Sequence, residues 1–156
     1  MENGHGAVVD IIIGSEELGP VHSVGEVEAV AGLGLKGDRY YERERQSTKD
    51  HDPSVEITLV ELEGIEAARE ESGLDITIED LRRNIVTTGI DLDPLVGRRF
   101  YVGDALVEAL DLNPPCRRLA RIAGKPLLKP LIGKAGIRGR ILEGGIIKKG
   151  DAVRPA

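Results

Sequence analysis

Glycine and proline interrupt this chain so often that long helices are hard to place in it. Its 156 residues include twenty glycines and eight prolines, which favour tight turns between short elements. The chain has no tryptophan, one phenylalanine and three tyrosines, so its core must be built from aliphatic side chains. The length suits one domain, over residues 1–156. These features predict short strands rather than a helical bundle.

Apolar alternation and turn signals divide the chain into short elements. The predicted strands are residues 7–13, 21–30, 55–60, 85–88, 99–102, 105–110 and 137–142, with a closing hairpin through 144–147 and a last strand from 152. The predicted helices are residues 61–71, a short one begun by Thr77, 116–123 and 127–132, and residues 43–53 are expected to form a mobile loop. With no repeating strand–helix pattern, this order predicts a mainly β domain: a β-barrel with a few short peripheral helices, which some definitions class as α+β.

The formal net charge of −6 argues against a general nucleic-acid binder, which would normally be basic. Positive charge is nevertheless clustered, and guanidinium groups suit the geometry of a small anion such as phosphate. Solvated surface charge is the alternative for each cluster. The clusters are Arg82 with Arg83, Arg98 with Arg99, Arg117 with Arg118 and Arg121, and the residues from Lys134 to Arg140.

No apolar stretch is long enough to span a bilayer, and the first residues do not resemble a signal peptide. With one cysteine and no export signal, we expect a cytoplasmic protein with no membrane partner. The three histidines, His5, His22 and His51, have no ligand spacing with each other, so each is more typical of a structural or solvated residue than of a metal ligand.

The segment Gly32-x-Gly34-x-x-Gly37 matches the dinucleotide-binding fingerprint by its letters. That motif works as a turn from a strand into a helix that packs on a parallel sheet. Here the last glycine is followed by an acidic residue and a charged stretch without an apolar face, so the match does not indicate a dinucleotide site.

Cys116 is the one cysteine, in Asn113-Pro114-Pro115-Cys116-Arg117-Arg118. The prolines stiffen the turn that presents the thiol. Neighbouring positive charge favours thiolate, which is the nucleophilic form and the form that binds soft metals. A buried, inert thiol is the alternative, since a lone cysteine is often a core residue.

Four segments, read in order, resemble the MOSC domain family, named for the C-terminal part of molybdenum cofactor sulfurases. The resemblance covers about residues 21–153 and indicates a stand-alone member. The segments are Gly34-Leu35-Lys36-Gly37-Asp38-Arg39-Tyr40, Arg82-Arg83-Asn84-Ile85-Val86, Leu95-Val96-Gly97-Arg98-Arg99-Phe100-x-Val102-Gly103, and Pro115-Cys116 ahead of Gly144-Gly145 and Gly150-Asp151.

This resemblance implies a mostly β-barrel fold that binds the molybdenum cofactor, a pterin dithiolene carrying a phosphate. It makes Cys116 the catalytic residue and molybdenum ligand. The residues that the resemblance and the charge pattern place around the cofactor are Asp38, Arg39, Arg82, Arg83, Asn84 and Arg117. For Asp38 the alternative is a turn-capping carboxylate paired with Arg39, and for the arginines near Cys116, including Arg118, it is surface solvation.

Three hypotheses follow from the resemblance. The first is an oxidoreductase that reduces N-hydroxylated compounds, with Cys116 on molybdenum and a separate reductase as partner. The second is a sulfur or cofactor carrier that uses a Cys116 persulfide and works with a sulfurase. The third is a non-catalytic binding module of the same fold. All three exclude nucleic acid as a partner.

Overall fold

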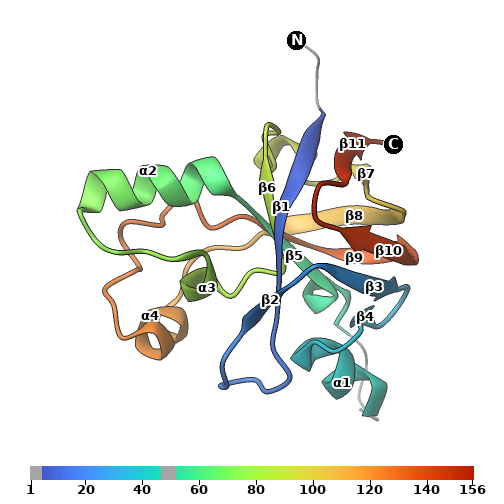
Figure 1. The fold of residues 1–156 in the computed structure, drawn as a ribbon, viewed down its shortest axis with the longest axis horizontal. Helices are drawn as coiled ribbons and strands as arrows, with labels where there is room; N and C mark the ends of the chain where they lie inside the picture. The colour runs from blue at the N-terminus through green and yellow to red at the C-terminus, as the bar shows by residue number, and fades with distance from the viewer. Residues whose placement is uncertain (1–4, 47–51) are drawn as a thin grey trace.

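The computed structural model describes residues 5–46 and 52–156, and seven of its strands close into a barrel (Figure 1). Around the barrel these are β11 (Ala152–Pro155), β7 (Arg99–Val102), β8 (Ala105–Leu112), β9 (Ile137–Glu143), β5 (Ile57–Glu61), β6 (Ile85–Thr88) and β1 (Gly6–Ile13). Pairing of β1 with β11 closes the ring, and β2 (His22–Val24) pairs with β1 as an added strand. β5 and β6 are parallel and the other neighbours antiparallel, so the barrel is mixed. The predicted mainly β barrel is confirmed.

A second, three-stranded sheet contains β10 (Gly145–Lys148), β3 (Glu26–Val30) and β4 (Gly34–Leu35). The closing hairpin predicted from residues 137–147 is therefore wrong, because β10 pairs with β3 and not with β9. Gly144 lies so close to the Ala29 carbonyl oxygen that an added Cβ would approach it to 2.6 Å. The chain leaves the barrel at this glycine and joins the second sheet.

The part of the chain that the structure describes has four α-helices outside the barrel: α1 (Arg39–Gln46), α2 (Leu62–Ser72), α3 (Ile78–Leu81) and α4 (Arg117–Ala123). α2, α3 and α4 lie on the same side of the barrel, and α1 lies beside β4 (Figure 1). Two signals read from the sequence are confirmed: Gly73 ends α2 in the left-handed conformation, and Thr77 begins α3 with a capping box to Asp80. Among the described residues, no helix has the length and apolar character needed to cross a membrane.

Three local predictions are corrected. The strand predicted over residues 21–30 is divided at Gly25 into β2 and β3. α1 occupies the first part of the loop predicted at 43–53, because Arg, Glu and Gln are good helix formers; a 3₁₀ helix, Pro53–Val55, ends that segment, and residues 47–51 with His51 lie outside the described residues. The helix predicted at residues 127–132 is absent: residues 128–134 form successive turns, since Pro130 has no N–H to donate.

The core has two layers separated by the barrel wall. One fills the barrel and includes Ile11, Ile57 and Ile137; the other lies between the wall and the helices and includes Ile12 and Val60. Alternate residues of a strand point to opposite faces, so one strand supplies both layers. The cavity described below adjoins this outer layer, because its lining includes Leu119 of the layer together with Thr58 of β5 and Arg138 of β9.

Candidate functional site

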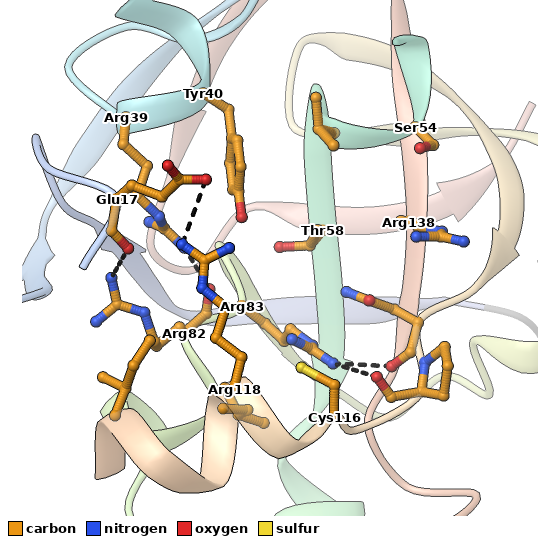
Figure 2. Close-up of a pocket in the computed structure, with 15 residues that line it drawn as sticks. Glu17, Arg39, Tyr40, Ser54, Thr58, Arg82, Arg83, Cys116, Arg118 and Arg138 are labelled. Atoms are coloured by element: carbon orange, nitrogen blue, oxygen red, sulfur yellow. Dashed lines mark hydrogen bonds and ion pairs between the residues drawn. The ribbon is translucent and has the colours of Figure 1, made fainter. Parts of the chain in front are cut away.

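Cys116 ends the turn of residues 113–116 that leads from β8 into α4 (Figure 2). The Asn113 N–H donates to the Gly136 carbonyl oxygen at 2.8 Å, which ties the start of this turn to the segment before β9. Cys116 is the residue before the first turn of α4, and its side chain makes no capping hydrogen bond there. The thiol is free and exposed, so the expectation of a buried cysteine, which was the alternative, is wrong.

Arg83 holds this turn in place through hydrogen bonds to its backbone. Its Nη2 donates to the carbonyl oxygens of Asn113 at 2.8 Å and Pro114 at 3.3 Å. Its Nε donates to the Ala135 carbonyl oxygen at 2.9 Å and its Nη1 to that of Leu81 at 3.2 Å. One side chain therefore connects the end of α3, the segment before β9 and the cysteine turn.

The charge of Arg83 is buried without a carboxylate among these hydrogen-bond partners, which are all backbone carbonyls. Burial lowers the pKa of Arg83 to about 10, because loss of water disfavours the charged form. The group keeps its proton at neutral pH. Its guanidinium lies near the Cys116 sulfur (Figure 2), so a positive charge is held beside the thiol.

Asn84 is a buried connector between strands. Its Oδ1 accepts from the Thr58 N–H and the Thr58 hydroxyl, both at 3.1 Å, and its Nδ2 donates to the Ile12 carbonyl oxygen at 3.2 Å. Its own backbone N–H donates to Thr58 Oγ1 at 2.9 Å. Asn84 is 1% exposed and is not among the residues that line the cavity, so it fixes β5 against β1 behind it.

Asp38 and Arg39 form a buried pair where the glycine-rich turn enters α1. Asp38 Oδ1 accepts from the Gly14 N–H at 3.1 Å and from Arg39 Nη1 at 3.0 Å. Arg39 Nη2 donates to the Arg82 carbonyl oxygen at 3.4 Å. The carboxylate thus holds Arg39 in place, which is the paired arrangement that the sequence left open. The Arg39 Nε is buried and has no hydrogen-bond partner among the described residues.

Arg82 ends α3 with a φ of 56°, the left-handed conformation that side chains other than glycine rarely adopt. Its Nη1 donates to the Gly19 carbonyl oxygen at 2.7 Å and its Nη2 to that of Glu17 at 3.0 Å. Burial is the main cause that lowers the pKa of Arg82. The backbone strain at this residue aims the guanidinium at the loop between β1 and β2.

A cavity of about 190 Å³ joins these elements on the outer side of the barrel (Figure 2). Four predicted site residues line it, namely Arg39, Arg82, Arg83 and Cys116. Asp38 and Asn84 are buried and support the site without lining it. Arg117 is exposed and is not a lining residue.

Arg118 and Arg138 also line the cavity; the sequence pointed to Arg118 only as one of the arginines near Cys116, and to Arg138 only as part of the basic cluster from Lys134 to Arg140. Successive helical residues are about 100° apart, so Arg118 faces the cavity where the sequence pointed to Arg117. Arg138 lies opposite Thr58 in the pairing of β9 with β5, and both point outward because their neighbours Ile137 and Ile57 fill the barrel. The alternation of β9 was the signal that could have found it.

The guanidinium of Arg138 is only partly satisfied. Its Nη2 lies 3.4 Å from Asp111 Oδ2 in a partly exposed ion pair. Its Nε is buried and, like the Arg39 Nε, has no hydrogen-bond partner among the described residues. Unpaired buried donors are uncommon in proteins, and both of these belong to arginines that line the cavity.

The comparisons agree with this architecture. The model of the MOSC domain family matches residues 48–154. The solved structure of the YuaD protein from Bacillus subtilis is similar with a TM-score of 0.80 at 19% identity, covering 96% of this chain and 94% of that one. YiiM from Geobacillus stearothermophilus gives 0.73 at 21%, covering 97% and 75%, and YiiM from Escherichia coli gives 0.71 at 18%, covering 97% and 69%.

At these identities the solved structures show a shared fold and no more. None of the curated proteins matches this sequence. The family model covers most of the chain, and it includes the Arg82–Asn84 segment, the cysteine turn and every barrel strand except β1. The chain belongs to the MOSC domain family.

Proposed function

We propose that this protein binds the molybdenum cofactor in the arginine-lined cavity, with Cys116 as a ligand to molybdenum. The observation that carries the proposal is an exposed thiol at a cavity lined by two arginines, Arg39 and Arg138, whose buried Nε atoms have no hydrogen-bond partner among the described residues. A thiolate is a soft ligand suited to a metal that already has sulfur ligands. Guanidinium groups suit a phosphate-bearing pterin.

The donor set fits such a group. The Nε atoms of Arg39 and Arg138 would donate to acceptor atoms of the phosphate or pterin, which removes the cost of leaving them unpaired. Arg83 would hold the cysteine turn and keep a positive charge beside the sulfur. Asp38 and Asn84 would keep Arg39 and Thr58 in position.

The bound cofactor would supply a metal centre that exchanges two electrons with a substrate. We propose that the substrate is an N-hydroxylated compound: two electrons and two protons convert its N–OH group to N–H and release water. Iron–sulfur clusters need several cysteine ligands and this chain has one, so the electrons would come from a separate reductase.

Metal analysis tests the proposal. The full chain, expressed in a host that makes the cofactor, is measured for molybdenum per protein, together with the variants Cys116→Ser and Arg117→Gln. We expect bound molybdenum in the wild type, its loss in Cys116→Ser and its retention in the exposed control Arg117→Gln. Absence of molybdenum from the wild type, or full retention in Cys116→Ser, would contradict the assignment.

The exposure of Cys116 favours a second candidate, a sulfur carrier with a Cys116 persulfide that accepts sulfur from a sulfurase. This candidate predicts a protein whose mass rises by one sulfur atom after incubation with a sulfurase and cysteine. Loss of the increment on reduction, and its absence in Cys116→Ser, would place the sulfur on the thiol. A wild type with molybdenum and no persulfide would reject the carrier.

A further inference from the structure

The loop between β1 and β2, here called the strap (residues 14–21), runs past the cavity and is held by its backbone. Arg82 donates to the Gly19 carbonyl oxygen at 2.7 Å and to that of Glu17 at 3.0 Å, and Arg82 itself is 8% exposed. Hydrogen bonds from a charged group are stronger than neutral ones. The strap backbone at Glu17 is therefore fixed, and its side chain is the part that can move.

The Glu17 side chain crosses from the strap to two helices. Its Oε1 lies 3.4 Å from Arg118 Nη2 of α4 and 3.4 Å from Arg43 Nη1 of α1. All three side chains are nearly half exposed: 47% for Glu17, 49% for Arg118 and 46% for Arg43. Exposed ion pairs of this kind contribute little to stability, because water screens them and ordering long side chains costs entropy.

Glu17 also stands between two cavities. The cavity beside Cys116 has a volume of about 190 Å³, and a second one along α1 has a volume of about 220 Å³. Glu17, Arg39 and Tyr40 line both, and Figure 2 shows these three side chains together at one edge of the first cavity. The first cavity alone is smaller than the roughly 300–1,000 Å³ typical of sites for small molecules.

We propose that Glu17 is an internal gate that determines how well the site takes an anionic ligand. Its carboxylate pairs with Arg118, a guanidinium that an incoming phosphate group would also bind, and its side chain lies between the two cavities. When a dianionic group binds, the Glu17 side chain rotates away while the strap stays in place, and the two cavities become continuous. The inference rests on the proposed function in one respect, that the ligand of this site carries a phosphate group.

The charge balance supports this assignment. Among the described residues, five arginines line the first cavity, and Glu17 is the one carboxylate residue of its lining. A phosphate group carries nearly two negative charges at neutral pH and three acceptor oxygens, so it competes well with a single exposed carboxylate for the same guanidinium. Removing the Glu17 charge should therefore strengthen anion binding beyond the effect of one charge elsewhere on the strap.

The test measures binding of inorganic pyrophosphate to the full chain by isothermal titration calorimetry at fixed ionic strength. We expect Glu17→Gln to bind pyrophosphate about fivefold more tightly than the wild type, the factor that corresponds to loss of a competing surface ion pair. Glu16→Gln is the matched control, with the same charge change one residue away, and should shift the affinity less than twofold. In Glu17→Gln/Arg118→Gln the gain should disappear.

Equal effects of Glu17→Gln and Glu16→Gln would overturn the gate, since they would reflect general electrostatics. Weaker binding by Glu17→Gln, no binding by any variant, or a gain that survives Arg118→Gln would overturn it as well. Because pyrophosphate contains no molybdenum, this result is independent of the metal analysis. A protein that never carries molybdenum can still show the gate, and a molybdenum protein can lack it.

Discussion

Arg83 and Asn113 are joined by a 2.8 Å hydrogen bond from the Arg83 Nη2 to the Asn113 carbonyl oxygen, thirty residues further along the chain. This bond places the cysteine turn against the segment between α3 and β6. The position of the Cys116 thiol is therefore set by a buried side chain from a distant part of the sequence. The prolines stiffen the turn, and Arg83 decides where the stiffened turn sits.

Replacing Arg83 by methionine should lower the free energy of unfolding by about 3 kcal/mol, because four backbone carbonyls lose their charged donor. Arg83→Lys keeps the charge but not the fork of donors, so its loss should be intermediate. Urea denaturation measures both. Arg117→Met, at an exposed position, is the control and should stay within about 0.5 kcal/mol of the wild type. If Arg83→Met unfolded at the same urea concentration as the wild type, the turn would not depend on this donor.

Asn84 and Thr58 should be energetically coupled, since each accepts from and donates to the other. Asn84→Ala should cost about 2 kcal/mol by leaving the buried Thr58 N–H and Ile12 carbonyl unpaired. In a double-mutant cycle with Thr58→Val, the combined loss should be smaller than the sum of the single losses by about 1 kcal/mol. Strict additivity of the unfolding free energies would argue against the network.

Gly136 should tolerate no side chain. Its φ is +92°, and an added Cβ would collide with the Leu59 carbonyl oxygen in β5. Gly136→Ala should therefore lower stability by more than about 3 kcal/mol or prevent folding, as measured by thermal unfolding and soluble yield. Gly133→Ala is the matched control: its φ is +76° with nothing near the added Cβ, so its loss should be about 1 kcal/mol. If the two variants lost equal stability, the cost would come from the positive φ alone and not from the collision with Leu59.

Arg138→Met should separate binding from stability. The Arg138 Nε is buried without a partner and its ion pair with Asp111 is partly exposed, so methionine should change the unfolding free energy by less than about 0.5 kcal/mol. Its molybdenum content should nevertheless fall several-fold if the side chain contacts the cofactor as proposed. A stable variant that retains full metal would remove Arg138 from the binding set.

Asp10 should make the stability of the folded protein depend on pH. Burial alone would raise its pKa, but hydrogen bonds from Ser23, Lys149 and the Ile11 N–H outweigh burial and hold the pKa below its ordinary value of 3.8. A depressed folded-state pKa contributes stability above the unfolded-state value, and this contribution is lost as the pH falls through the folded-state value.

Asp10→Asn should therefore be less stable than the wild type at pH 7, by less than about 1 kcal/mol because the group lies near the surface. Below the ordinary pKa of 3.8 the difference should progressively disappear. Urea midpoints of both proteins across the range from neutral to acidic pH provide the measurement. A difference that does not depend on pH would assign the effect to packing.

The barrel strands were predictable because alternation and turn residues are local signals. β1, β6, β7 and β9 lie close to their predicted bounds, as do the turn between β7 and β8 and the start of α3. Residues 127–132 misled the prediction because Leu127 and Leu131 have helical spacing and are both buried, yet Pro130 interrupts the hydrogen-bond ladder. Burial of these leucines depends on the outer core layer, which local sequence does not describe.

The sequence predicted the site residues that stand out by residue type and neighbours. It did not predict those that reach the site only through contacts between distant segments. Cys116 and the Arg82–Asn84 segment stand out by composition, but their roles in the folded chain differ. Arg83 lines the cavity, Asn84 lies behind it, and Arg82 directs its donors to the strap. Glu17 carries no local signal of a site, since a charged residue in a loop is ordinarily solvated, and for Arg138 the alternation of β9 shows only which face of the strand it lies on.

The mainly β architecture, the family resemblance and the stiffened turn around Cys116 follow from local signals, because alternation, glycine and proline positions and a lone cysteine act over a few residues. Three other features appear only in the folded chain: β10 leaves the barrel for the second sheet, Arg118 lines the cavity and Arg117 does not, and Glu17 pairs with Arg118 there. These outcomes depend on register and on contacts between distant segments, and such contacts form only when the barrel closes.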